Sequence, residues 1–132
     1  MVLDASAVLA FLQGEPGHEQ VAEALLAQPC VVCAANQTEV VAKSLDRGLA
    51  LESLHSVIAA LGYEVVSVQP EDGVLAGELR PATRHLGLSL GDRLCLAVAL
   101  RLQAPVLTAD RPWLTLAGPL GLTIHCVRPE AR

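Results

Sequence analysis

The chain has 132 residues, of which 52% are hydrophobic and 17% charged, and its formal net charge is −5 at pH 7. This length suits a single domain, residues 1–132, with a core that needs no disulfide bonds. No apolar run approaches the roughly 18 residues that a membrane span requires. The acidic balance, together with one Trp, one Tyr and one Phe, excludes a basic protein that coats nucleic acid or stacks bases on an aromatic surface.

In chain order, a strand at residues 2–3 and a helix at 5–12 begin an alternation of short strands and helices. The other strands are predicted at 30–33, 64–68, 106–108 and 122–127, the last one at a sheet edge, and the other helices at 18–27, 34–47, 49–61, 70–86 and 92–103. Pro81 should kink or break the helix in which it lies. Because no hairpin signal occurs, we predict an α/β fold: a short, mainly parallel sheet between helices, in three α/β/α layers.

The segment MVLDASAVLA has no basic residues and carries Asp4 within its apolar run, so we expect no secretory signal and a cytosolic protein. Four cysteines occur, and Cys30 and Cys33 have a CxxC spacing. Positions i and i+3 of a strand point to opposite faces, so we expect the cysteines to pack in the core. The apolar excess suggests contact with a partner chain, with the helices at 21–26 and 49–61 as candidate faces.

The stretch from Leu88 to Trp113 predicts half of a functional site. The helix at 92–103 is apolar nearly all round, as expected of a helix packed between layers. Ala104 and Pro105 end it, and the buried strand at 106–108 follows. Asp92 therefore opens the helix and Asp110 lies just past the next strand, where open α/β sheets place their chemistry.

Four acidic residues are flanked by apolar ones and are difficult to explain as solvated surface: Asp4, Glu39, Asp92 and Asp110. The other carboxylates, Asp72 among them, are interpreted as residues of polar helix faces or turns. Three of the four lie at a strand end or helix start, and Glu39 lies on the helix after a strand. A parallel sheet can bring all four to one edge.

Each of these acids has a structural alternative, because the three aspartates can cap helices and Glu39 can be exposed. Four converging carboxylates, however, would repel one another and raise their own pKa values unless a cation lay between them. Hard oxygen ligands without an accompanying set of His or Cys residues favour Mg²⁺ or Mn²⁺ over zinc.

Four segments, MVLDASAVLAFL, CAANQTEVV, LSLGDRLCLAVAL and VLTADRPW, occur in this order along the chain. They resemble the successive motifs of PIN domains, and in particular those of VapC toxins of bacterial type II toxin–antitoxin pairs. The resemblance implies that Asp4, Glu39, Asp92 and Asp110 form the acidic quartet that holds one or two divalent metal ions. It also implies that Ser6 and Thr108 are the small hydroxyl residues beside that quartet. Pro112 is the slight departure from the pattern.

The resemblance implies a metal-dependent endoribonuclease in which a metal-activated water hydrolyses an RNA phosphodiester. The aspartates would be ligands, and Glu39 would either ligate a metal or orient the water. Flanking phosphates could be held by Arg84, Arg93 and Arg111. The implied partners are a cognate VapB-like antitoxin, whose C-terminal segment occludes the acidic cleft, and a second copy of the chain in a homodimer.

Two alternatives belong to other classes. A phosphatase of the haloacid-dehalogenase kind would use Asp4 as its nucleophile, but a second aspartate is then expected two residues later, where this chain has Ser6. A non-catalytic module that only sequesters a partner would not need to bind Mn²⁺.

Overall fold

The computed structural model describes residues 1–129, and its centre is a five-stranded sheet in which every paired strand is parallel. The strand order is β3-β2-β1-β4-β5. The strands are β1 (Val2–Leu3), β2 (Val31–Cys33), β3 (Glu64–Val66), β4 (Val106–Thr108) and β5 (Ile124–Cys126). The predicted parallel sheet is confirmed, and β5 is an edge strand as expected.

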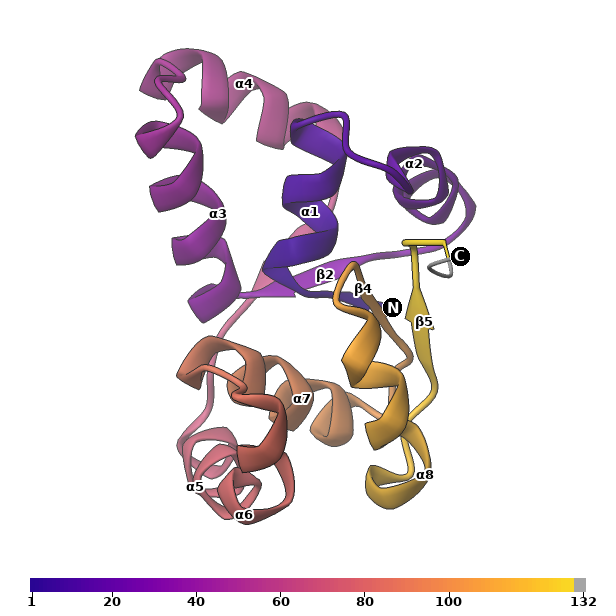
Figure 1. Ribbon diagram of the computed structural model, residues 1–132. Coiled ribbons are helices and arrows are strands. Elements are labelled where there is room, and N and C mark those ends of the chain that lie inside the picture. Colours follow the sequence, from indigo (N-terminus) through magenta and orange to yellow (C-terminus); the bar gives the residue numbers. More distant parts are fainter. Residues whose placement is uncertain (130–132) are drawn as a thin grey trace.

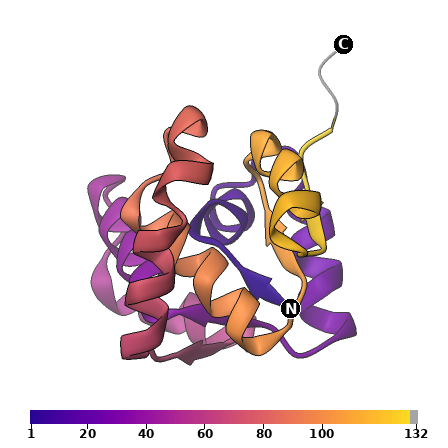
Figure 2. The same cartoon turned by 90° about the horizontal axis from the view of Figure 1, so that it is seen from below.

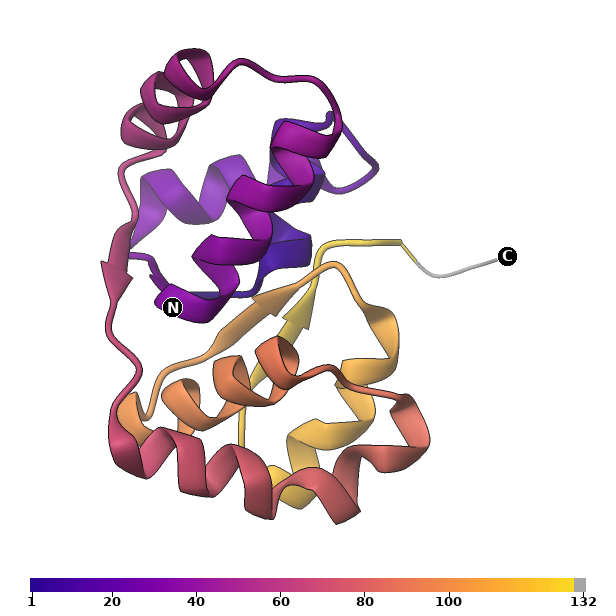
Figure 3. The same ribbon diagram turned by 90° about the vertical axis from the view of Figure 1, so that its left-hand side faces the viewer.

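Helices cover both faces of this sheet, which confirms the three-layer fold (Figures 1 and 3). One face carries α1 (Ala5–Leu12), α2 (His18–Ala27), α3 (Ala34–Asp46) and α4 (Leu51–Leu61). The other carries α5 (Pro70–Glu78), α6 (Arg80–Thr83), η1 (Arg84–Leu86), α7 (Leu90–Leu102), η2 (Arg111–Leu116) and α8 (Ala117–Leu120). Figure 2, seen from the side of α5 to α8, shows β1 in indigo near the middle of the molecule.

The two side chains of β1 point to opposite faces of the sheet, and each packs in a different apolar core. Leu3 joins one cluster with Val8, Val21 and other residues of the first four helices. Val2 joins the second cluster, where Trp113 is completely buried. Successive strand residues point to opposite faces, so a two-residue strand is enough to anchor both layers.

Several predicted helices differ from the observed ones at their ends, and the helix expected at 49–61 begins at Leu51. The helix expected from Asp92 begins at Leu90, because Ser89 is its N-cap and Asp92 completes a capping box with it. The helix expected at 70–86 ends at Glu78 and is followed by α6 and η1. Pro81 lies in the first turn of α6, where its missing N–H costs no hydrogen bond.

The sequence interpretation placed Asp72 on a polar surface, and this is wrong. The Asp72 side chain is 1% exposed, and its Oδ1 accepts a hydrogen bond from Nε of Arg101 at 2.8 Å. Its Oδ2 accepts from the Gln69 backbone N–H, which caps α5. Burial raises the pKa of this carboxyl group, but the hydrogen bonds from Arg101 and Gln69 outweigh burial and leave the pKa below its usual value. The pair joins α5 to the end of α7.

In the part of the chain that the structure describes, no helix has the length and apolar character needed to cross a membrane. The four cysteines are free, and Cys30, Cys33 and Cys95 are buried. Cys30 and Cys33 therefore pack in the interior, as the sequence predicted for the CxxC pair, and Cys126 is partly exposed.

We expect Arg101→Met to lower the free energy of unfolding by about 2 kcal/mol, because it leaves the buried Asp72 carboxylate without its cation. Urea unfolding monitored by circular dichroism measures this change. The control is Arg80→Met at an exposed position of α6, which should change stability by no more than about 0.5 kcal/mol. Equal effects of the two substitutions would show that the ion pair does not stabilise the fold.

Candidate active site

The site is built on Asp4, which follows β1 and caps α1. Its carboxylate is buried, at 2% exposure, and both oxygens accept hydrogen bonds. Oδ1 accepts from the Ser6 hydroxyl at 2.8 Å and from the Ala7 backbone N–H at 2.9 Å. Oδ2 accepts from the Thr108 hydroxyl at 2.6 Å. Asp4 therefore caps α1, which was the structural alternative to a catalytic role, and it also links β1 to β4.

The same hydroxyl groups position the turn that carries Asp110. The Asp110 backbone N–H donates to Oγ1 of Thr108 at 3.0 Å, and the Ala109 N–H donates to Oγ of Ser6 at 2.9 Å. Asp110 is the N-cap residue of η2 but makes no side-chain capping bond. Ser6 and Thr108 thus lie beside Asp4, where the resemblance to PIN domains implied small hydroxyl residues.

Glu39 and Asp92 are brought together by a close contact between α3 and the first turn of α7. The Asn36 side chain, 1% exposed, donates to the Gly91 carbonyl oxygen at 3.0 Å. A Cβ added at Gly91 would overlap Oε1 of Glu39, so only glycine leaves room for the glutamate in this position. Asp92 accepts a hydrogen bond from the Ser89 N–H at 2.9 Å, which fixes its side chain.

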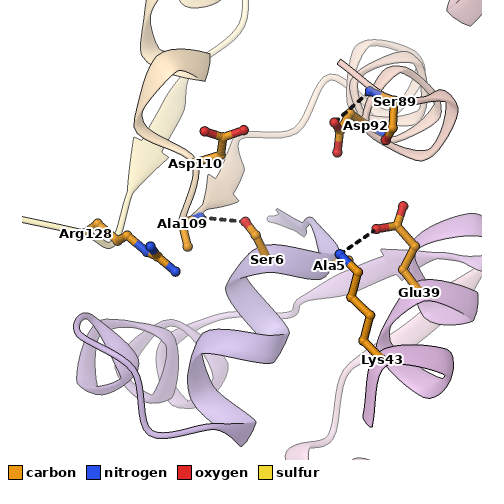
Figure 4. A pocket seen from close by; sticks show the side chains of 9 residues that line it. All are labelled: Ala5, Ser6, Glu39, Lys43, Ser89, Asp92, Ala109, Asp110 and Arg128. Atoms are coloured by element: carbon orange, nitrogen blue, oxygen red, sulfur yellow. Dashed lines mark hydrogen bonds and ion pairs between the residues drawn. The ribbon is translucent and has the colours of Figure 1, made fainter. Parts of the chain in front are cut away.

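These elements enclose a cavity of about 550 Å³ at the carboxyl edge of the sheet (Figure 4). Its lining includes Glu39, Asp92 and Asp110, with Ser6 between them. Asp4 does not line the cavity but lies beneath Ser6, to which it is hydrogen-bonded. The structure thus gathers three of the four predicted acids around one space and buries the fourth below it.

The basic residues of the cavity are Lys43 and Arg128, which the sequence interpretation did not single out. Nζ of Lys43 lies 3.8 Å from Oε2 of Glu39, one helical turn away on α3. The spacing of Glu39 and Lys43 was a usable signal, because residues i and i+4 of a helix are neighbours. Arg128 follows β5 and had no comparable signal.

The three arginines predicted to hold phosphates lie outside the lining of this cavity. Arg93 points toward α5, where its Nη1 donates to the Ala76 carbonyl oxygen at 3.0 Å. Arg111 donates from Nη1 to the Arg128 carbonyl oxygen at 3.2 Å. Arg84 is an exposed residue of η1.

The pKa values of the acids reflect crowding and burial. Burial raises the pKa of Asp4 to about 6, against the lowering effect of its hydrogen bonds. Burial and the nearby Asp92 carboxylate raise the pKa values of Glu39 and Asp110 as well. Concentrated negative charge of this kind favours a cationic ligand.

The donor set suits a hard cation, since its oxygens come from carboxylates and hydroxyls. Within residues 1–129, however, no three Asp, Glu, His or Cys side chains are already arranged to hold a metal ion. Mg²⁺ retains several water ligands and commonly takes only one or two protein carboxylates directly. Glu39, Asp92 and Asp110 around a 550 Å³ cavity fit that mode of binding.

Comparison with known proteins identifies the class. Residues 1–118 match the PIN domain family, and the chain therefore belongs to the PIN domain family. A search of curated protein sequences gave no match.

Solved structures of toxin–antitoxin systems share the fold. A toxin–antitoxin complex from Klebsiella pneumoniae has a chain that superposes with a TM-score of 0.73 at 16% identity, covering 98% of both chains. VapBC-1 from nontypeable Haemophilus influenzae gives 0.70 at 17% identity, covering 96% of both chains. VapBC-5 from Mycobacterium tuberculosis gives 0.60 at 21% identity, covering 97% of both chains.

We expect the metal-free protein to become less stable as the pH rises, because the folded-state pKa of Asp4 exceeds its ordinary value of 3.8. A carboxyl group that binds its proton more tightly in the folded state stabilises the fold at low pH. That stabilisation is lost as the pH passes through the folded pKa. Stability should fall by roughly 2 kcal/mol between about pH 4.5 and about pH 7, and urea unfolding in EDTA measures it.

Asp4→Asn is the matched control, because an amide oxygen can still accept from the Ala7 N–H but does not titrate. The pH dependence should be much smaller in this variant. Stability that increases over the same range in the wild-type protein, or an identical profile in Asp4→Asn, would contradict the assignment.

Proposed function

We propose that this protein is a Mg²⁺- or Mn²⁺-dependent endoribonuclease and the toxin of a VapBC-type toxin–antitoxin pair. The observation that carries the proposal is the cavity lined by Glu39, Asp92 and Asp110 above the buried Asp4. Membership of the PIN domain family and the shared fold of toxin–antitoxin structures support it.

In this mechanism Asp92 and Asp110 would hold the metal, directly or through water. When bound, the ion supplies a water of lowered pKa and neutralises charge that develops on the phosphate. The chain contributes geometry: Asp4 fixes the Ser6 and Thr108 hydroxyls, and these fix the backbone that presents Asp110. Glu39 either ligates the ion or accepts a hydrogen bond from the attacking water at its carboxylate.

The structure disfavours Asp4 as the nucleophile of a phosphatase. Its carboxylate is 2% exposed, and hydrogen bonds occupy both oxygens. Substrate phosphorus could reach neither oxygen without rearrangement of α1 and β4. A non-catalytic partner-binding module is distinguished by the cleavage assay described below.

The proposed partners are a VapB-like antitoxin and a second copy of the chain. An antitoxin segment that bears arginine would complement the acidic cavity. Exposed apolar side chains on the two candidate faces support a homodimer: Leu26 is 90% exposed on α2, and Leu51 and Val57 of α4 are 49% and 42% exposed. We place the protein in the cytoplasm as one PIN-like domain over residues 1–132.

Asp92→Asn and Asp110→Asn should each reduce metal-dependent RNA cleavage by on the order of 100-fold or more, the size of losing a group that stabilises developing charge. The asparagine oxygen at position 92 can still cap α7, so the fold should persist. Gel analysis of a labelled RNA with Mg²⁺ or Mn²⁺ measures cleavage, and Glu71→Gln on the exposed face of α5 is the control. Wild-type rates in both variants would refute the nuclease.

Gly91→Ala separates catalysis from folding. The added methyl group would overlap Oε1 of Glu39, which can swing away because it is the end of a flexible side chain. Alanine also favours the helix by up to about 1 kcal/mol. We therefore expect an unchanged or higher Tm without metal, a smaller rise of Tm on adding Mn²⁺, and weaker cleavage. Full activity and a wild-type response to Mn²⁺ would show that the position of Glu39 is unimportant.

A further inference from the structure

A second groove, of about 380 Å³, adjoins the acidic cavity and shares Ser6, Lys43 and Arg128 with it. It runs over α1 and the C-terminal half of α3, and its lining adds Arg47, Glu15 and Asp46. Three of the chain's nine Lys and Arg residues therefore meet in one groove of a protein whose net charge is −5. The groove has more cations than carboxylates, and the adjoining cavity has the opposite balance.

Arg128 is held in this groove by contacts of the segment around it. Val127 is 1% exposed, and its N–H donates to the Thr108 carbonyl oxygen at 2.9 Å, next to the active-site turn. The backbone of Val127 passes so close to Gly17 that a Cβ there would overlap the Val127 carbonyl group. Nη2 of Arg128 then reaches Oε2 of Glu15 at 2.6 Å. In Figure 4 its guanidinium group points into the cavity below Asp110.

Arg47 is connected to the same carboxylate through Gln13. With its amide nitrogen turned toward Glu15, the Gln13 oxygen accepts a hydrogen bond from Nε of Arg47 at 3.3 Å. Glu15 thus holds the Arg128 guanidinium group directly at the groove and is linked to Arg47 only through Gln13. The Arg128 side chain is 46% exposed, and that of Glu15 is 31% exposed. A ligand anion can therefore replace Glu15 as the partner of Arg128.

We infer that this groove holds the phosphate backbone of single-stranded RNA on one side of the bond that is cut. The inference rests on the proposed function, because it places the scissile phosphate in the adjoining acidic cavity. Arg128 and Arg47 contact flanking phosphates, since guanidinium groups bind phosphate oxygens through paired hydrogen bonds. Lys43, shared by groove and cavity, lies where the strand passes from one to the other.

The occupant is a nucleic-acid backbone rather than an apolar peptide, because charged and polar side chains supply the groove's chemistry. The one Phe, one Tyr and one Trp of the chain are absent from its lining, so bases are not stacked there. Recognition through phosphates alone makes binding strongly salt-dependent and insensitive to base sequence on this side.

The test measures binding separately from cleavage. A labelled single-stranded RNA with phosphorothioate linkages, which resist hydrolysis, is titrated by fluorescence anisotropy in Mg²⁺ over a range of salt concentrations. Arg128→Gln and Arg47→Gln should each weaken binding roughly tenfold and reduce the slope of log K against log salt by about 0.7. Glu15→Gln should tighten binding by roughly twofold, because it releases Arg128 from its carboxylate. Arg80→Gln, on the opposite face of the sheet, should bind like the wild-type protein.

The outcomes separate this inference from the proposed function. If the wild-type protein cleaves RNA but Arg128→Gln and Arg47→Gln bind like it, the groove assignment is overturned and the nuclease stands. If the wild-type protein binds RNA without cleaving it, and both variants bind less, the groove is still a binding site for the RNA backbone and the nuclease is overturned. Absence of RNA binding overturns both. A polyglutamate peptide serves as a model of an acidic protein partner. If Arg128→Gln and Arg47→Gln weaken binding of this peptide but leave RNA binding unchanged, the groove binds an acidic protein and the inference is overturned. Circular dichroism confirms that each variant is folded.

Discussion

Hydroxyl groups, and not a basic residue, hold the buried carboxylate of Asp4. Ser6 and Thr108 donate to its oxygens, and Thr108 comes from a strand more than a hundred positions later in the chain. Burial raises the pKa of this carboxyl group to about 6, because the hydrogen bonds lower the pKa without bringing a positive charge next to the carboxylate. The hydroxyl oxygens of Ser6 and Thr108 also accept hydrogen bonds from the backbone N–H groups of Ala109 and Asp110, respectively. One hydrogen-bonded unit therefore fixes β1, α1 and β4 relative to one another and determines where Asp110 lies.

The contact between α3 and α7 completes the arrangement from the other side. These helices cover opposite faces of the sheet and contact each other near the start of α7. Asn36 and Gly91 make this approach close. The absence of a side chain at Gly91 leaves space for the Glu39 carboxylate beside Asp92, and burial together with the Asp92 charge raises the pKa of Glu39. The neighbouring carboxylates lower the stability of the fold here, as is common at functional sites.

The sequence predicted the sheet and the main acidic positions because both depend on local pattern. Asp4, Glu39, Asp92 and Asp110 are acidic residues among apolar neighbours. Glu39, Asp92 and Asp110 line one cavity, and Asp4 is buried next to it. Asp72 was misinterpreted because its neighbours are Glu71 and Gly73, and its burial depends on Arg101, which is 29 positions away. The start of α7 was misplaced because Ser89 and Asp92 share the capping box. Arg128 had no local signal, since its position depends on the contact between Val127 and Gly17.

The net charge of the chain gives little information about the charge at any one point of its surface. Charges farther apart than about 8–10 Å are largely screened at physiological ionic strength, so a phosphate responds to the side chains next to it. An acidic protein can therefore bind an anion wherever a few cations are held together, as Lys43, Arg47 and Arg128 are. Glu15 limits how strongly that group attracts arbitrary anions, because an incoming anion must displace it from Arg128. Under the proposed function, a strand that also places a phosphate over the adjoining metal-binding carboxylates gains a second attraction. An anion that reaches only the groove lacks this second attraction. The protein then distinguishes an RNA strand from other anions because two neighbouring sites bind the same ligand.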